Sequence, residues 1–201
     1  MTRLVAISQR VVIDPRHGER RDALDQRWVP FLAACSLTPV ALPNASAAAL
    51  AILDQAPLGG LILSGGGDIG PLGGDTPERD EAEQLAVEWA RAHHKPIIGI
   101  CRGAQHLTHL FGGTLAPLAG HVGTRHALAP DGRMVNSFHG WGIAAAPPDA
   151  EILARSADDG SIEAFHLSRA RLTALLWHPE RELTPNLADI TMFTQALDID
   201  P

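Results

Sequence analysis

The sequence is poor in the residues and segments that mark secreted and membrane-spanning proteins. It contains two cysteines in 201 residues, too few for a disulfide framework, and Cys35 lies in an apolar stretch that predicts a small buried side chain. No apolar run approaches the roughly 18–20 residues that a membrane-spanning helix needs. Residues 1–7 also lack the apolar core and cleavage site of a signal peptide. We therefore expect a cytoplasmic protein that does not act at a membrane.

Positive charge is also scarce. The formal net charge is −7, and Lys95 is the sole lysine, so nearly all the positive charge comes from arginine. This balance argues against a general nucleic-acid-binding protein. Hydrophobic residues make up 45% of the chain, which is typical of a globular protein, and 201 residues are enough for a sizeable core. We expect a single domain over residues 1–201.

Short apolar runs alternate with helical patterns through the first half of the chain. The pattern predicts strands at 4–7, 39–42, 60–63 and 96–100, and helices at 19–35, 46–54, 77–93 and from 101 to about 111. The second half predicts further strands at 133–137, 151–155, 161–166 and 172–177, and a last helix over about 186–197. Alternation at this spacing predicts an α/β fold in which helices cover both faces of a mostly parallel central sheet. Some strands of the second half are expected to be antiparallel.

Cys101 stands where a buried strand is predicted to turn sharply into a helix, within Gly99-Ile100-Cys101-Arg102-Gly103. A tight turn of this kind exposes its central side chain at the carboxyl edge of the sheet, as in a nucleophile elbow. The flanking glycines allow neighbouring backbone to approach closely. The helix N-terminus favours a thiolate and points N–H groups at a developing oxyanion. We interpret Cys101 as a nucleophile, and the alternative is a buried structural cysteine beside a turn.

His178 and Glu180 follow the strand predicted at 172–177, in Trp177-His178-Pro179-Glu180. Pro179 biases His178 toward an extended conformation, in which residues two apart point the same way. A carboxylate bound to one ring nitrogen fixes the tautomer of the histidine and leaves the other nitrogen for the thiol. A His-x-Glu pair alone is a weak signal, but together with Cys101 it predicts a Cys-His-Glu triad.

These motifs together resemble the class I glutamine amidotransferase superfamily. The resemblance rests on the glycine turn at 64–68, the elbow through Gln105, Phe111-Gly112-Gly113 and the motif at 177–180, which occur in the family order. It spans most of the chain. It implies a three-layer α/β sandwich of flavodoxin-like type.

Further motifs resemble a narrower branch, the gamma-glutamyl-gamma-aminobutyrate hydrolase family, whose members are free-standing hydrolases. They are Arg79-Asp80-x-x-Glu83 and Val135-Asn136-Ser137-x-His139. The segments 7–10, 20–28 and 177–182 resemble the subgroup of gamma-glutamyl-CDP-amidate hydrolases from bacterial capsule phosphoramidate pathways. The resemblance implies cleavage of a gamma-glutamyl amide to glutamate and an amine or phosphoramidate, with gamma-glutamyl-CDP-amidate as the substrate in that subgroup.

The resemblance also implies a role for each matching residue. Cys101 would attack the gamma-carbonyl to form a glutamyl thioester, and His178, oriented by Glu180, would protonate the leaving amine and then activate water. Backbone N–H groups of Gly66 and Arg102 would form the oxyanion hole. The residues expected to line the glutamyl site are Gln105, Asn136, Ser137 and His139. This scheme requires neither a metal ion nor an organic cofactor.

Two departures from the family pattern lie on the leaving-group side of the expected site. The stretch from Asp68 to Arg79 is shorter than is usual in the branch, where it helps to wall that side. His139 is followed by Gly140-Trp141, where many relatives carry another polar residue. The sequence therefore leaves the leaving group open.

Two polar clusters invite functional interpretation. Arginines gather near the N-terminus as Arg10, Arg16, Arg20, Arg21 and Arg27. Arg10 is a candidate to hold a phosphate of the leaving group, and the alternative, preferred for Arg27, is a solvated face paired with nearby acids. In the second cluster, Arg125 is expected to face the substrate. His121 and His126 match no standard zinc spacing and have no thiol nearby, so we expect no metal site.

Three functions stay open at this point. The first is a free-standing gamma-glutamyl hydrolase, acting on a CDP-amidate or on gamma-glutamyl-GABA in amine catabolism. The second is a glutaminase subunit that supplies ammonia to a synthase partner, and the third is a non-catalytic binding module. Intact Cys101, His178 and Glu180 argue against the third. We expect a small-molecule substrate and no nucleic-acid partner; a homodimer is compatible with the sequence, which does not give the oligomeric state.

Overall fold

The structure is a computed structural model that describes residues 3–199, so both ends of the predicted domain, 1 and 201, lie outside the described residues. Its parallel strands are β1 (Arg3–Ser8), β4 (Leu37–Leu42), β5 (Leu58–Leu63), β6 (Ile97–Ile100) and β13 (Leu172–Leu175). Its α-helices are α1 (Trp28–Ala34), α2 (Ser46–Gln55), α3 (Pro77–Ala92), α4 (Arg102–Leu110) and α5 (Leu187–Ala196). None of the helices in this range combines the length and the apolar character that a membrane crossing requires.

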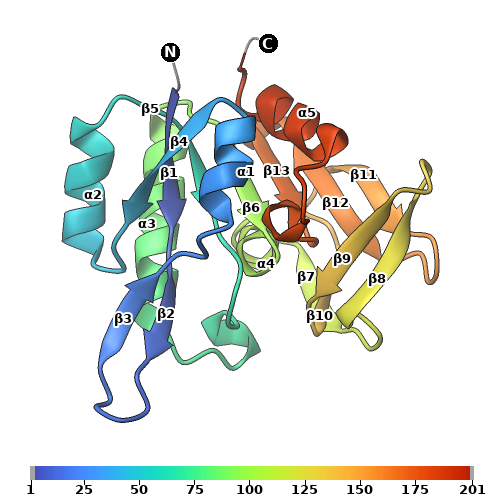
Figure 1. Cartoon of the computed structure of the whole chain (residues 1–201), viewed down its shortest axis with the longest axis horizontal. Coiled ribbons are helices and arrows are strands. Elements are labelled where there is room, and N and C mark those ends of the chain that lie inside the picture. The colour runs from blue at the N-terminus through green and yellow to red at the C-terminus, as the bar shows by residue number, and fades with distance from the viewer. Residues whose placement is uncertain (1–2, 200–201) are drawn as a thin grey trace.

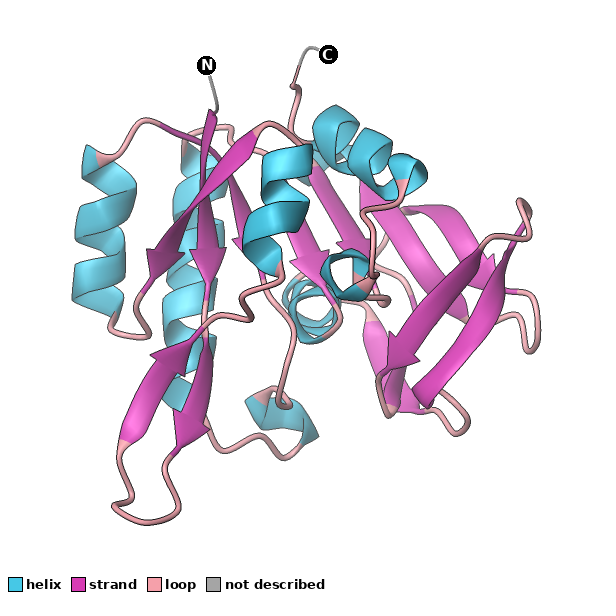
Figure 2. Cartoon of the chain, in the orientation of Figure 1, coloured by secondary structure: helices cyan, strands magenta, loops and turns pink. Residues whose placement is uncertain are grey.

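The parallel strands form the centre of the sheet in the order β4-β1-β5-β6-β13 (Figures 1 and 2). Their sequences are nearly continuous apolar runs because helices cover both faces of parallel strands. Every residue of β5 and of β6 is buried. The sequence pattern predicts all five strands, with ends that differ from the observed ones by at most two residues.

Side chains of these strands alternate between two apolar layers. In β1, Val5 and Ile7 pack in the cluster that contains Trp28 of α1 and Phe193 of α5. Ala6, which lies between them in sequence, packs in the other cluster, with residues of α2, α3 and α4. The helices therefore cover both faces of the sheet, and the predicted three-layer α/β sandwich is confirmed.

The sheet continues beyond β13 with antiparallel strands. In order these are β12 (Ile162–Leu167), β11 (Glu151–Ser156), β8 (Val122–Ala129) and β9 (Met134–Phe138), and β10 (Trp141–Ala145) pairs with β12 and with β7 (Thr114–Pro117). Antiparallel strands in the second half are thus confirmed, but β7, β8 and β10 are not among the predicted strands. The first four residues of β8 are exposed, so its sequence has no apolar run, and pairing with β9 and β11 makes it a strand.

The helix predicted at 19–35 is wrong over its first half. Arg20–Ala23 form strand β3, which pairs antiparallel with β2 (Arg10–Ile13), and α1 begins only at Trp28. The backbone of β3 gains a hydrogen-bonded ladder from β2, and helical periodicity within residues 19–35 cannot reveal this pairing. From Trp28 onward the helical interpretation holds, because α1 buries its apolar side chains against the sheet.

Strands β5, β6 and β13 are neighbours, and their carboxyl ends meet at one edge of the sheet. The β2-β3 hairpin and the 3₁₀ turn Gly70–Leu72 extend beyond this edge, at the bottom of Figure 1. Ligands bind at the carboxyl edge in open sheets of this kind. The predicted site residues that follow β5, β6 and β13 are therefore brought together here.

Candidate active site

Cys101 occupies a strained turn between β6 and α4. Its backbone has a φ of 51° and a ψ of −106°, which residues with side chains rarely adopt. The Cys101 N–H donates to the carbonyl of Leu175 at 2.8 Å and ties the turn to β13. The turn also requires Gly103, because a Cβ there would lie 2.2 Å from the carbonyl oxygen of Leu63. This geometry is that of a nucleophile elbow, as the sequence predicts.

His178 and Glu180 lie just beyond β13 and face this turn. His178 Nδ1 is 2.7 Å from Glu180 Oε1, and both side chains are buried. Asn136 of β9 clamps the backbone of His178 on both sides. The Asn136 amide oxygen accepts from the His178 N–H at 3.0 Å, and its Nδ2 donates to the His178 carbonyl at 2.8 Å. The position of the ring is therefore fixed by its own backbone and by the carboxylate.

The charge state of His178 depends on Cys101. Burial lowers the pKa of His178, but the negative charge and hydrogen bond of the Cys101 sulfur, followed by those of Glu180, outweigh burial and raise the pKa to about 9. Such a histidine is protonated at neutral pH. Its imidazole therefore contacts the Cys101 sulfur and the Glu180 carboxylate at the same time.

Removal of the Cys101 sulfur is expected to lower the pKa of His178 below about 9, because its main charged partner is lost while burial persists. The measurement is an NMR titration of the imidazole in Cys101→Ala, with the His178 resonance assigned from its absence in His178→Gln.

In the wild type the raised pKa of His178 stabilises the folded protein, and this contribution is fully present below the pKa of the unfolded histidine, about 6.5. That contribution is lost as the pH rises through about 9. An unchanged pKa in Cys101→Ala would show that the two side chains do not interact.

The glycine turn after β5 borders the same site and is held by Arg79. Arg79 Nη2 donates to the carbonyls of Ser64 at 2.7 Å and Gly65 at 3.4 Å, and Nη1 donates to the carbonyl of Gly66 at 2.6 Å. The Gly65 carbonyl and the Gly66 N–H belong to the same trans peptide group, so they point in opposite directions. Because the Gly65 carbonyl faces Arg79, the Gly66 N–H points away from Arg79. Gly66 has a φ of 95°, which favours glycine. Arg102 is the first residue of α4, so its N–H has no acceptor within the helix.

A buried charge network lies behind the nucleophile turn and centres on Glu83 of α3. Glu83 is 1% exposed and accepts from Ser8 Oγ at 2.7 Å and from Arg79 Nε at 2.9 Å. Its other carboxylate oxygen pairs with Arg102 and lies 2.9 Å from His106 Nδ1. Burial raises the pKa of Glu83, but Arg79 and Arg102 outweigh burial and hold that pKa well below its usual range. The network therefore links the glycine turn to the start of α4.

A pocket of about 100 Å³ opens beside Cys101 and His178. Its lining residues are Gly66, Gly67, Asp68, Cys101, Gln105, Phe138, His139, Gly140, His178 and Arg181. Sequence reasoning did not identify Arg181 as a site residue. The Arg181 guanidinium lies over the Phe138 ring at 4.7 Å, and Nε is 3.7 Å from Glu180 Oε1. Its place directly after Glu180 is the signal that could have found it.

The structure brings Gln105 and His139 into this pocket but places the other predicted binding residues elsewhere. Asn136 is used to clamp His178. Ser137 Oγ donates to the carbonyl of His121 at 2.7 Å, and Arg125 forms an exposed ion pair with Glu182 at 3.0 Å. These three residues support their neighbours and do not line the pocket, because pairing of β8 with β9 turns them toward other parts of the fold.

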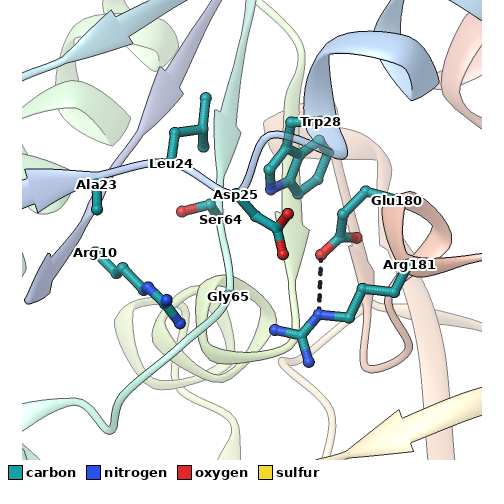
Figure 3. A pocket seen from close by; sticks show the side chains of 9 residues that line it. All are labelled: Arg10, Ala23, Leu24, Asp25, Trp28, Ser64, Gly65, Glu180 and Arg181. Atoms are coloured by element: carbon teal, nitrogen blue, oxygen red, sulfur yellow. Dashed lines mark ion pairs between the residues drawn. The ribbon is translucent and has the colours of Figure 1, made fainter.

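Arg10 lies at a second, smaller pocket that adjoins the first. Figure 3 shows the Arg10 and Arg181 side chains extending toward this pocket from opposite sides, with Gly65 and Glu180 in its wall. The Arg10 side chain crosses the glycine turn, since a Cβ on Gly66 would lie 3.1 Å from Arg10 Cδ. Within residues 3–199 Arg10 makes no ion pair. Three other arginines of the cluster do pair with acids: Arg20 with Glu78, Arg21 with Glu19 and Arg27 with Asp25.

Known proteins resemble this chain in sequence and in fold. The Peptidase C26 family model matches residues 3–131 and 118–180. The chain is 28% identical over 184 residues to the gamma-glutamyl-CDP-amidate hydrolase of Campylobacter jejuni. The aligned region covers 89% of this chain and 90% of that protein. It is also 35% identical over 137 residues to a glutamine-hydrolyzing GMP synthase of Thermomicrobium roseum. That aligned region covers 63% of this chain and 24% of the synthase. A crystal structure described as that of a candidate GMP synthase subunit from Thermoplasma acidophilum shares the fold, with a TM-score of 0.71 at 21% identity over 99% of this chain and 94% of that one.

Proposed function

The chain belongs to the Peptidase C26 family, and we propose that it is a cysteine hydrolase that cleaves a gamma-glutamyl amide bond. The family and the similar hydrolase of Campylobacter jejuni support an amide hydrolase. The observation that carries the proposal is the strained Cys101 beside the buried His178–Glu180 pair, at a pocket that the glycine turn borders. The proposed catalytic residues are Cys101, His178 and Glu180.

In the first half of the reaction the Cys101 thiolate attacks the gamma-carbonyl carbon of the bound substrate. Negative charge develops on the carbonyl oxygen, where the N–H groups of Gly66 and Arg102 stabilise it. His178 gives its proton to the leaving nitrogen as the C–N bond breaks, so that a glutamyl thioester remains on Cys101. Glu180 fixes the His178 tautomer and stabilises the imidazolium.

In the second half the now neutral His178 removes a proton from water. The resulting hydroxide attacks the thioester carbonyl, and the same two N–H groups stabilise the second oxyanion. Collapse of this intermediate breaks the C–S bond, releases glutamate and restores the Cys101 thiolate and the protonated His178. The cycle proceeds with these residues and water.

The surroundings of the pocket favour a leaving group that carries phosphate. Arg181 lines the main pocket, and Arg10 lies over its glycine edge without an acidic partner in the described part of the chain. Guanidinium groups bind phosphate through charge-assisted, often bidentate hydrogen bonds. We therefore favour gamma-glutamyl-CDP-amidate as the substrate, with glutamate and a nucleoside diphosphoramidate as products. The role in capsule biosynthesis that the resemblance implies stays a prediction.

The proposal is tested by turnover of the purified protein alone on glutamine, gamma-glutamyl-GABA and gamma-glutamyl-CDP-amidate. We expect the highest kcat/KM for the CDP-amidate. Preference for gamma-glutamyl-GABA would keep the hydrolase mechanism but overturn the phosphorylated leaving group. Absence of turnover on all three would contradict the free-standing hydrolase.

Replacement of Arg10 by alanine is expected to lower kcat/KM for gamma-glutamyl-CDP-amidate by about ten- to a hundredfold, the size of a lost charge-assisted hydrogen bond. Turnover of gamma-glutamyl-p-nitroanilide, which carries no phosphate, is expected to change little. The matched control is Arg21→Ala on the same hairpin, because Arg21 already pairs with Glu19. Equal losses on both substrates would assign Arg10 to structure.

A glutaminase that supplies ammonia to a synthase partner is the second candidate. The similarity to the glutamine-hydrolyzing GMP synthase favours it, although the chain spans about a quarter of that protein. A glutaminase of this kind would be slow on glutamine alone and accelerated by its synthase. The substrate comparison above distinguishes the two, because this candidate predicts no turnover of the CDP-amidate.

A further inference from the structure

A second cluster of titratable side chains lies behind the pocket wall, where strands β8, β9 and β12 come together. His121 precedes β8, His126 lies within it, His139 follows β9 and Glu163 belongs to β12. All four side chains are buried, and Glu163 is 0% exposed. Within residues 3–199 the atoms His121 Nδ1, His126 Nε2, His139 Nε2 and both carboxylate oxygens of Glu163 have no hydrogen-bond partner. So many unsatisfied polar atoms at one buried place indicate a missing partner.

We infer that this cluster binds a divalent transition-metal ion, and that the ion is zinc. Glu163 Oε1 lies 3.4 Å from His121 Nδ1 and 3.6 Å from His139 Nε2, and Glu163 Oε2 lies 3.5 Å from His126 Nε2. These separations are long for N–H···O hydrogen bonds. They suit ligands of one ion, because tetrahedral zinc bound at about 2.0–2.1 Å holds neighbouring ligand atoms about 3.3 Å apart. The ligand atoms of His121, His139 and Glu163 all lie within 4.8 Å of one another.

Two histidines have an outer contact at one ring nitrogen and face Glu163 with the other. His139 Nδ1 lies 3.2 Å from the carbonyl of Trp141, and its Nε2 faces Glu163. His121 Nε2 lies 3.0 Å from the carboxylate of Asp159, and its Nδ1 faces Glu163. A carboxylate or carbonyl behind each ligating histidine is the usual outer contact of a zinc site.

The cluster gives a ligand set that suits zinc. His121, His139 and Glu163 supply three ligands that converge on one point. His126 lies 3.5 Å from the other Glu163 oxygen and flanks the group. Imidazole nitrogens suit zinc and its transition-metal neighbours better than they suit magnesium or calcium. The expectation of no metal site rested on the spacing of His121 and His126 and on the lack of a nearby thiol, and the fold adds His139 and Glu163, which lie far from them in the sequence.

The proposed ion is structural, because its ligands are buried and the triad mechanism does not use the cluster. It would join β8, β9 and β12 into one rigid unit. His139 also lines the main pocket, and the carbonyl of Trp141 that it contacts accepts from Gln105 Nε2 at 2.9 Å. The ion would therefore fix the wall of the pocket that Gln105 and His139 form.

The test is the metal content of the full chain. The protein is purified without a histidine tag, and its metal content is measured by inductively coupled plasma mass spectrometry. We expect about one zinc per chain, the stoichiometry of a single site. Stripped protein refilled with Co²⁺ is expected to show the visible absorption of tetrahedral cobalt. Glu163→Gln and His121→Gln are expected to lose the metal. The matched controls are His166→Gln, on the same strand as Glu163, and Cys101→Ala, which tests the active-site thiol as a ligand; both are expected to keep the metal.

A measurement on the wild type keeps the test decisive if the ligand variants do not fold. Removal of zinc by a chelator is expected to lower Tm by several degrees, and added zinc is expected to restore it. The proposal is overturned if wild-type protein holds no zinc and the stripped protein takes up neither Zn²⁺ nor Co²⁺. It is also overturned if folded Glu163→Gln or His121→Gln protein keeps the full metal content, or if Cys101→Ala loses it. Because the readout is metal content, failure here is separate from failure of the proposed hydrolase activity.

Discussion

Replacement of Cys101 by alanine is expected to lower kcat/KM for a gamma-glutamyl amide by about 10³-fold or more, because the reaction loses its nucleophile. No other thiol or hydroxyl lines the pocket among the described residues. The measurement is release of p-nitroaniline from gamma-glutamyl-p-nitroanilide under single-turnover and steady-state conditions. Circular dichroism establishes that the variant is folded. Turnover near the wild-type rate in folded Cys101→Ala would exclude Cys101 as the nucleophile.

Cys35 provides the matched control for this substitution. It is the second free cysteine, and it is buried in the cluster of α1 and α5 rather than in the pocket. Burial raises the pKa of the Cys35 thiol to about 12, so this thiol does not supply a thiolate at neutral pH. Cys35→Ala is expected to keep hydrolysis close to that of the wild type. A comparable loss in both variants would indicate a general effect of removing a buried sulfur.

Replacement of Glu83 by glutamine is expected to lower the free energy of unfolding by about 3–5 kcal/mol, because it leaves buried guanidinium groups without their carboxylate. Arg79 and Arg102 are 1% and 0% exposed, and both pair with Glu83. The change is measured by urea denaturation near neutral pH. Activity is expected to fall as well, because Arg79 also holds the glycine turn of the proposed oxyanion hole.

The pH dependence of stability gives a second check on Glu83. Its pKa is lowered in the folded protein, so its contribution is present above the unfolded value of about 4.3 and is lost as the pH falls toward the folded value. The difference between wild type and Glu83→Gln is therefore expected to be largest above about pH 5 and to shrink in acid. Glu81→Gln on the same helix is the control, because the Glu81 contact with Ser46 is exposed, and its effect is expected to stay within about 0.5 kcal/mol. A similar loss in both variants would contradict a buried network.

The sequence predicted the central sheet and the positions of Cys101, His178 and Glu180 because these depend on local patterns. Buried parallel strands appear as continuous apolar runs, and sharp turns after them are marked by glycine and proline. Cys101 and His178 each directly follow a predicted strand, and the structure shows that these two strands, β6 and β13, are neighbours. The Cys101 turn itself, with its positive φ, follows from the strand–glycine–helix pattern.

The features that the sequence could not predict depend on contacts between segments rather than on the pattern within one segment. The β2-β3 hairpin replaced half of an expected helix because strand pairing outweighed a weak helical pattern. Asn136 was expected in the glutamyl site, but pairing of β9 with β8 directs it to the backbone of His178. His121 and Glu163 lie far apart in the chain, so their meeting in one buried cluster requires the folded sheet.

Covalent trapping of the nucleophile tests the central claim most directly. The protein is incubated with 6-diazo-5-oxo-norleucine, a glutamine analogue that alkylates an attacking thiolate, and the intact mass and the peptide map are measured. The account predicts stoichiometric labelling of Cys101, no labelling of Cys35, and a much slower reaction in His178→Ala. Labelling of Cys35, or an unlabelled protein that still hydrolyses gamma-glutamyl amides in the presence of the analogue, would contradict the proposed mechanism.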